Sequence, residues 1–115
     1  MIHWGLLYHL DDWKRDLNTA LRHARRLSLE SEVMDSPNPT DEVKINEYWD
    51  TGAKNGRGTR MTAAAVELVF AERDIAFHRY DDSDLNAAYH CYDWLDGTWP
   101  GRTGDGLRRF WMTRI

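Results

Sequence analysis

The sequence predicts an α+β domain, in which a small three-stranded sheet carries helices on one face. Residues 2–10 and 107–115 alternate along the chain with a period of two, which is typical of half-buried strands. Between these segments, apolar residues recur at the three- and four-residue spacing of amphipathic helices. The predicted order is β-α-α-α-β-α-β. An all-α bundle is the alternative, because the middle and last strands are short.

The N-terminal part predicts one strand followed by one long helix. Within 2–10 the even-numbered residues share one face, which we expect to be buried. Asp11 and Asp12 then end the strand and supply a helix cap. The helix is expected from Trp13 to about Leu29. Its apolar stripe consists of Trp13, Leu17, Ala20, Leu21, Ala24 and Leu27.

The middle of the chain predicts a break, a short helix and a loop. Residues 30–40 are acidic and turn-rich, with two prolines. Thr40 caps a helix expected over 41–50, with Ile45, Tyr48 and Trp49 facing inward. Val43 and Ile45 also fit a strand, so this segment has two interpretations. Residues 51–59 are expected to form a loop.

The second half predicts two more helices and two strands. Thr62 caps a helix over 63–74, which is followed by a strand over 75–80 and a turn over 81–84. A helix is expected over 85–95, then a loop over 97–106 and the last strand over 107–115. The residues expected to be mostly buried are Trp4, Leu17, Leu21, Val66, Phe70, Tyr89 and Tyr92.

Composition places the chain among small folded proteins. Its 115 residues, 13.5 kDa in mass, predict a single domain over 1–115. Hydrophobic residues make up 42% and charged residues 30%, too apolar for a disordered chain. The longest apolar stretch, 63–71, is too short to cross a bilayer, so no membrane contact is expected. A single cysteine, Cys91, and no secretory signal at the N-terminus favour a cytoplasmic location.

No motif in the sequence specifies a reaction, and neither a cofactor nor a metal site is expected. His90 and Asp93 share one stripe of the helix predicted over 85–95, and a histidine oriented by a carboxylate is half of a general-base arrangement. His78 is a further candidate base. The alternative for His90 and Asp93 is a solvated helix face with a local hydrogen bond.

The glycine-rich stretch over 52–60 precedes a predicted helix and carries Lys54, Arg57 and Arg60. Glycines free backbone N–H groups to face an anion, and the helix N-terminus adds positive potential. The stretch lacks the Gly-Lys-Ser/Thr ending of a Walker A loop. It therefore predicts either a site for a phosphate-bearing ligand or a flexible connector.

Charge is unevenly distributed in a chain whose net charge is −4. Residues 30–50 and 81–96 are acidic, whereas 51–60 and 101–115 are basic. The second acidic stretch contains no Lys or Arg, and its acids are Asp81, Asp82, Asp84, Asp93 and Asp96. The first three suit a helix start, but Asp93 and Asp96 would lie near a helix C-terminus, where acids are unfavourable. One explanation for these two acids is that they bind an external partner, and the other is that they keep the protein soluble.

These observations favour a small cytoplasmic binding protein over an enzyme. We expect an inhibitor or adaptor whose acidic, aromatic-rich surface contacts a basic protein, such as nucleic-acid-binding machinery. The alternative is an enzyme or sensor that holds a phosphate-bearing small molecule through 52–60. Nucleic acid is a less favoured partner, because the net charge is negative. The residues that would contact it are Trp99, Arg102, Arg108, Arg109, Phe110, Trp111 and Arg114, unless these aromatics fill the core and the arginine stems cover them.

Overall fold

The computed structural model describes residues 1–47, 56–104 and 106–115. Over these residues the protein is α+β, with two helices and six strands in two sheets. The all-α alternative is therefore wrong. The order and the sheet size also differ from the prediction, because the larger sheet has four strands and the smaller one has two.

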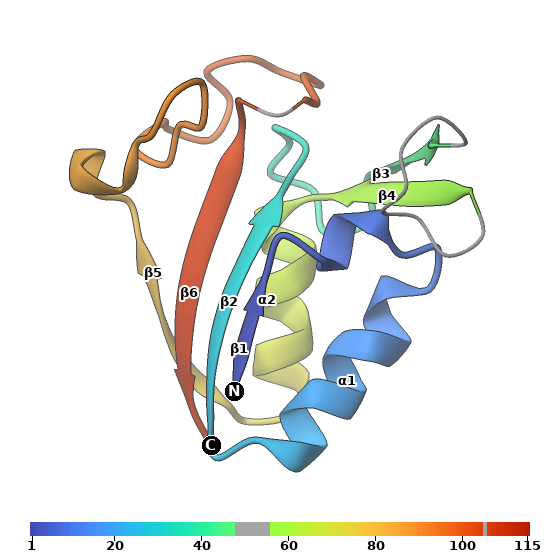
Figure 1. The fold of residues 1–115 in the computed structure, drawn as a ribbon, viewed down its shortest axis with the longest axis vertical. Helices are drawn as coiled ribbons and strands as arrows, with labels where there is room; N and C mark the ends of the chain where they lie inside the picture. The colour runs from blue at the N-terminus through green and yellow to red at the C-terminus, as the bar shows by residue number, and fades with distance from the viewer. Residues whose placement is uncertain (48–55, 105) are drawn as a thin grey trace.

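The larger sheet has the strand order β1-β2-β6-β5 (Figure 1). β1 pairs parallel with β2, and the remaining pairs are antiparallel. β3 and β4 form the second, antiparallel sheet. The strands are β1 (Ile2–Trp4), β2 (Arg26–Glu32), β3 (Glu42–Asn46), β4 (Arg57–Met61), β5 (Ala76–Tyr80) and β6 (Arg108–Arg114).

Two helices, α1 (Trp13–His23) and α2 (Ala63–Glu72), cover one side of the larger sheet (Figure 1). Both begin at predicted caps: Asp12 accepts a hydrogen bond from the Arg15 amide, and Thr62 accepts one from the Ala65 amide. The core between helices and sheet includes Leu17, Leu21, Leu27, Leu29, Val66, Phe70 and Trp111. The burial predicted for Leu17, Leu21, Val66 and Phe70 is confirmed.

The first predicted strand is shorter than expected and faces the other way. It ends at Trp4, because Gly5 adopts a positive φ of 64° and the chain then forms a 3-10 turn, η1 (Leu7–His9). Pairing with β2 places His3 beside Leu29 on the covered side and leaves Trp4 55% exposed. The predicted burial of the even-numbered residues was therefore wrong for Ile2, Trp4 and Leu6, whereas Tyr8 is buried, in η1.

The first helix ends six residues earlier than its predicted end at Leu29, at His23. Leu27 does fit the helical stripe, but Leu27 and Leu29 also alternate with polar residues, and both are fully buried in β2. Seven residue pairs with β6 decide the conformation of this segment. A local pattern compatible with both structures was thus settled by a strand more than 75 residues away.

Two other predicted helices are wrong. The helix over 41–50 is replaced by β3, which pairs with β4, and its residues 48–50 lie outside the described part. The helix over 85–95 is replaced by a 3-10 turn, η2 (Ser83–Leu85), and irregular chain, in which Ala88 has a positive φ of 52° and Tyr89 is 68% exposed. Of the loop predicted over 51–59, residues 57–59 belong to β4 and 51–55 are not described.

Phe70→Ala should lower the free energy of unfolding by about 3–5 kcal/mol, because it leaves a cavity in the core. Leu68→Ala is the matched control on the same helix, and because Leu68 is exposed its loss should stay below about 1 kcal/mol. Urea unfolding of both variants measures the difference. Equal losses at the two positions would contradict the packing of α2 against the sheet.

Candidate functional site

The side of the larger sheet opposite the helices is not covered by any described helix (Figure 1). Successive strand residues point to opposite sides, so the neighbours of the buried Leu29 and Trp111 face outward. We call this side the open face. Its central residues are Ile2, Trp4, Ser28, Glu30, His78, Tyr80, Phe110 and Met112.

A row of aromatic rings crosses the open face from β1 to β5. Ring centroids are 6.0 Å apart for Trp4 and Phe110, 5.6 Å for Phe110 and Tyr80, and 4.3 Å for Tyr80 and His78. The Trp4 indole Nε1 donates a hydrogen bond of 2.9 Å to the Ser28 hydroxyl, which orients the exposed ring. His78, the candidate base, is therefore the last ring of this row.

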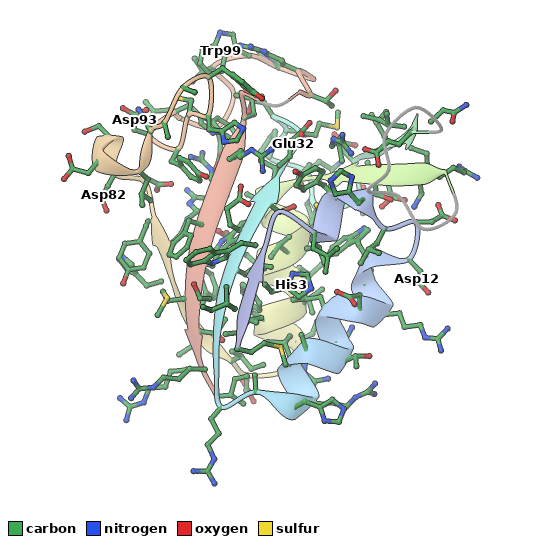
Figure 2. All side chains as sticks on the ribbon, viewed as in Figure 1. His3, Asp12, Glu32, Asp82, Asp93 and Trp99 are labelled. Carbon is green, nitrogen blue, oxygen red and sulfur yellow. The ribbon has the colours of Figure 1, made fainter. Side chains whose placement is uncertain are left out.

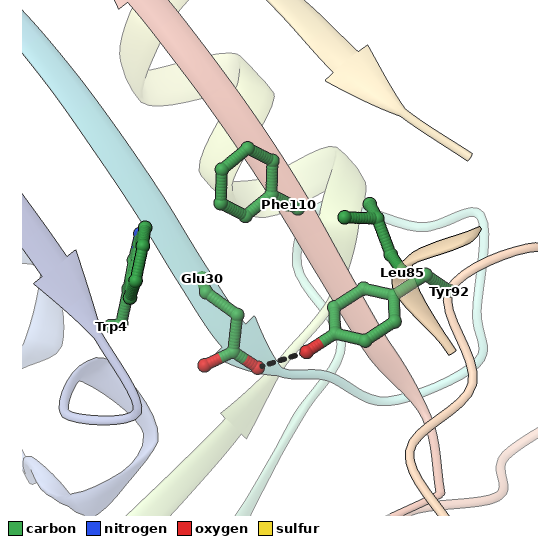
Figure 3. A pocket seen from close by; sticks show the side chains of 5 residues that line it. All are labelled: Trp4, Glu30, Leu85, Tyr92 and Phe110. Carbon is green, nitrogen blue, oxygen red and sulfur yellow. Dashed lines mark hydrogen bonds between the residues drawn. The ribbon is translucent and has the colours of Figure 1, made fainter. Parts of the chain in front are cut away.

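A pocket of about 240 Å³ lies beside Trp4 and Phe110, the first two rings of this row. Its lining consists of Trp4, Glu30, Leu85, Tyr92 and Phe110. Figure 3 shows Trp4 on one side, Leu85 and Tyr92 on the other, and the Glu30 carboxylate between them. The pocket thus combines aromatic walls with one acidic group.

The carboxylate of Glu30 is held by donors from three parts of the chain. Its Oε1 accepts hydrogen bonds from Arg108 Nη1 at 2.8 Å and from the Tyr92 hydroxyl at 3.4 Å. Its Oε2 accepts one from the Gly5 amide at 2.9 Å. These contacts fix the position of the acidic group before any ligand arrives.

Behind Glu30 a buried ion-pair network continues to the second sheet. Arg60 of β4 donates from Nε to Glu32 at 2.7 Å and from Nη2 to Glu47 at 2.8 Å. Glu47 in turn contacts His9 Nδ1 at 2.9 Å. The Tyr8 ring lies 4.9 Å from the guanidinium carbon of Arg60 and 4.9 Å from that of Arg108. Buried charges of this kind require partners, and here carboxylates and guanidinium groups supply them to one another.

The protonation of Tyr92 and Arg108 is stable near neutral pH. Burial, followed by the nearby charge of Glu30, raises the pKa of the Tyr92 phenol to about 12. Burial also opposes the charge of Arg108, but hydrogen bonds to Glu30 and Tyr8 outweigh it and raise its pKa. Tyr92 and Arg108 therefore act as permanent hydrogen-bond donors, and they do not form an acid–base couple poised near pH 7.

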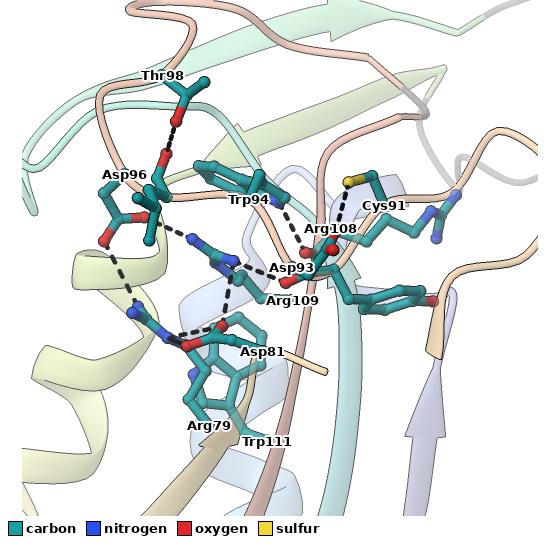
Figure 4. A network of polar contacts seen from close by, with 12 residues as sticks. Arg79, Asp81, Cys91, Asp93, Trp94, Asp96, Thr98, Arg108, Arg109 and Trp111 are labelled. Carbon is teal, nitrogen blue, oxygen red and sulfur yellow. Dashed lines mark hydrogen bonds and ion pairs between the residues drawn. The ribbon is translucent and has the colours of Figure 1, made fainter. Parts of the chain in front are cut away.

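A second network attaches the acidic segment 81–96 to the sheet (Figure 4). Arg109 is fully buried, donates to Asp81 at 3.1 Å and to Asp96 at 2.8 Å, and lies 3.6 Å from the centroid of the Trp94 ring. Arg79 also pairs with both aspartates, at 3.3 and 3.6 Å. Asp81 and Asp96 thus have partners inside the protein, which accounts for Asp96 without an external one.

The other acids predicted for partner binding are more accessible. Asp82, directly before η2, and Asp84, within it, are exposed. Figure 2 shows Asp82 and Asp93 among the loops at the upper end of the sheet. Asp93 accepts hydrogen bonds from Asn86 and Cys91. Both bonds lower its pKa, and the bond from Asn86 has the larger effect. Since no helix forms over 85–95, the spacing that related His90 to Asp93 is lost, and His90 instead packs edge-on against Tyr89.

The residues predicted to bind phosphate do not form one group in the described part of the chain. Lys54 lies outside the described residues. Arg57 is exposed, 3.9 Å from Asp11, whereas Arg60 is buried between two glutamates. Three positions apart on one strand, Arg57 and Arg60 also point to opposite sides.

Sequence reasoning missed that many charged residues are buried. Glu30, Glu32, Asp35 and Glu47 are all buried, so these four acids of the stretch 30–50 do not contribute to an acidic surface. Trp111 fills the core, as the alternative to nucleic-acid binding anticipated, whereas the burial of Arg108 and Arg109 in ion pairs was not predicted. One sequence signal did indicate a strand in this region: Leu27 and Leu29 alternate with the polar Ser28 and Glu30.

Comparisons of the chain with family models, curated proteins and solved structures found no match. Among the described residues, neither helix has the length and apolar character needed to cross a membrane.

Arg60→Met should lower the free energy of unfolding by about 3–5 kcal/mol, because it leaves Glu32 and Glu47 buried without their common partner. Arg57→Met, on the same strand but exposed, is the control and should change it by less than about 0.5 kcal/mol. Chemical denaturation measures both. Similar values for the two variants would contradict a structural role of the buried pair.

Stability should fall as the pH rises from about 10 towards the Tyr92 pKa of about 12. The folded-state pKa is raised, so the contribution of Tyr92 is complete below the unfolded-state value and is lost as the pH rises to the folded-state pKa. Tyr92→Phe should reduce this alkaline decline, whereas Tyr89→Phe, at an exposed position, should not. Denaturation midpoints across this pH range test it, and an unchanged decline in Tyr92→Phe would be the contrary result.

Proposed function

We propose that this chain is a small binding protein, an inhibitor or adaptor, that holds a basic protein partner at the upper end of its open face. The observation that carries the proposal is the pocket in which aromatic walls, exposed at Trp4 and part-buried at Tyr92 and Phe110, surround the Glu30 carboxylate. Large aromatic side chains are usually buried, and those left exposed in a cluster are the common anchors of protein interfaces.

The chemistry of the pocket favours a cationic side chain. Aromatic faces attract ammonium and guanidinium groups, and a carboxylate pairs with them. An ionised carboxylate accepts about four hydrogen bonds. Glu30 receives them from Arg108, Tyr92 and Gly5, which leaves room for a donor from a Lys or Arg of the partner.

The acidic residues around the pocket also favour a positively charged ligand. Asp82, directly before η2, and Asp84, within it, are both exposed, and the same turn contributes Leu85 to the pocket. Residues 81–96 contain no Lys or Arg that would weaken their field. Acidic groups at the rim of an interface accelerate association with basic partners, and proteins that bind nucleic acid present such basic surfaces.

The stable protonation of Tyr92 in the pocket wall favours binding over catalysis. A general acid or base works best when its pKa is near the operating pH, and Tyr92 is far from it. This is the physical reason for preferring a binding protein to the enzyme alternative.

The proposal is tested by titrating ¹⁵N-labelled protein with capped pentapeptides that carry a central Arg, Lys or Glu between glycines. We expect the Arg and Lys peptides, but not the Glu peptide, to shift the amide signals of Glu30 and Phe110. Trp4→Ala should weaken this binding about fivefold, the size of a cation–π contact at a partly exposed site. Trp99→Ala, in a different loop, is the aromatic control and should leave the affinity unchanged.

A charge series completes the test. Asp82→Asn with Asp84→Asn should weaken binding of the Arg peptide more at low salt than at high salt, since exposed charges are screened. Glu72→Gln with Asp74→Asn makes the same charge change at the exposed end of α2 and beyond, and should have little effect. Equal shifts with the Arg and Glu peptides, or equal effects of the two charge pairs, would overturn the proposal.

A further inference from the structure

The opposite end of the open face carries two arginines directly across from each other. Arg26 begins β2, Arg114 ends β6, and the two are paired in the strand register. Both are exposed, at the lower end of the sheet in Figure 1. Arg26 and Glu30 are four positions apart on β2, a distance of about 13 Å along a strand. The arginine pair therefore lies away from the acidic pocket.

No ion pair within the described residues stabilises this pair. Like charges directly opposite on neighbouring strands destabilise a sheet. In the described part of the chain, no carboxylate lies within ion-pair distance of Arg26 or Arg114. Five other arginines of the described residues, in contrast, have carboxylate partners: Arg57, Arg60, Arg79, Arg108 and Arg109. An anion between the two guanidinium groups would turn their mutual repulsion into attraction.

The two arginines also line a surface pocket of about 330 Å³. The other residues of this pocket are Ala76, Phe77, His78, Met112 and Thr113. His78 of β5 and Met112 of β6 are paired in the strand register, and Met112 is two residues before Arg114 on β6. The pocket thus offers two guanidinium groups, an imidazole ring and an apolar thioether side by side.

We propose that Arg26 and Arg114 form a binding site for the phosphate group of a small phosphomonoester. Planar guanidinium groups donate paired hydrogen bonds to phosphate oxygens, and two of them match the charge of a phosphate dianion. Met112 and the His78 ring supply a surface for the organic part of the ligand. This site goes beyond the proposed function, because it differs from the acidic pocket in charge, in residues and in position.

The test uses inorganic phosphate and phenyl phosphate as probes of the intact chain. In ¹H–¹⁵N spectra, both are expected to shift the side-chain Nε–Hε signals of Arg26 and Arg114, with sodium chloride at equal ionic strength as the reference. Phenyl phosphate should also shift the Met112 methyl signal. Arg26→Gln with Arg114→Gln should weaken the affinity for phenyl phosphate about tenfold or more.

A second double variant separates a site from general charge attraction. Arg15→Gln with Arg22→Gln removes the same charge from exposed positions on α1 and should leave the affinity nearly unchanged. The Arg26→Gln, Arg114→Gln protein should also unfold at no lower urea concentration than the parent, because a repulsive pair has been removed. Shifts no larger than those caused by chloride, or equal weakening by both double variants, would overturn the site. The peptide titrations are independent of these results.

Discussion

The contact of Arg60 with two buried glutamates joins the parts of this fold. Arg60 belongs to β4, Glu32 ends β2 of the larger sheet, and Glu47 follows β3. The same guanidinium also donates to the carbonyl oxygen of Tyr8 in η1 at 2.9 Å. Burying these charges costs desolvation energy that only good geometry offsets, so the two sheets and the turn are held in one relative position. The close approach requires glycine at position 58, where a Cβ would lie 2.5 Å from the Tyr8 carbonyl oxygen.

The candidate pocket depends on this arrangement. Tyr8 lies between Arg60 and Arg108, and Arg108 holds Glu30 in the open face. A carboxylate fixed by three parts of the chain loses little freedom on binding a cation, which is the advantage of preorganisation. The Arg109 network has a parallel role, because it attaches the irregular segment that brings Tyr92 and Leu85 to the pocket. Irregular chain can therefore form a defined wall here without a helix or strand of its own.

The open face has a different chemistry at each end. The upper end carries Glu30 and its aromatic walls, and the lower end carries Arg26 and Arg114. The row of rings connects them, because Trp4 and Phe110 line the upper pocket and His78 lines the lower one. Two adjacent sites of opposite charge on one rigid sheet would let a protein partner and a phosphate-bearing molecule bind next to each other, so that each could alter the affinity for the other through their charges.

The sequence by itself determined the α+β class, both helix starts and much of the core. Asp12 and Thr62 accept hydrogen bonds from amides only three residues away. The apolar stripes, Leu17 with Leu21 and Val66 with Phe70, repeat within one or two helical turns. Neighbouring residues therefore suffice to predict both. Only the tertiary structure decided that Arg26–Glu32 is a strand, that Trp4 is exposed and that residues 85–95 are irregular. It also decided which charges are buried: Glu30 meets Arg108 across 78 residues, and Arg60 meets Glu32 across 28. The physical reason is that strand pairing and ion pairs join residues far apart in the chain, and local spacing carries no information about which distant partner each residue will meet.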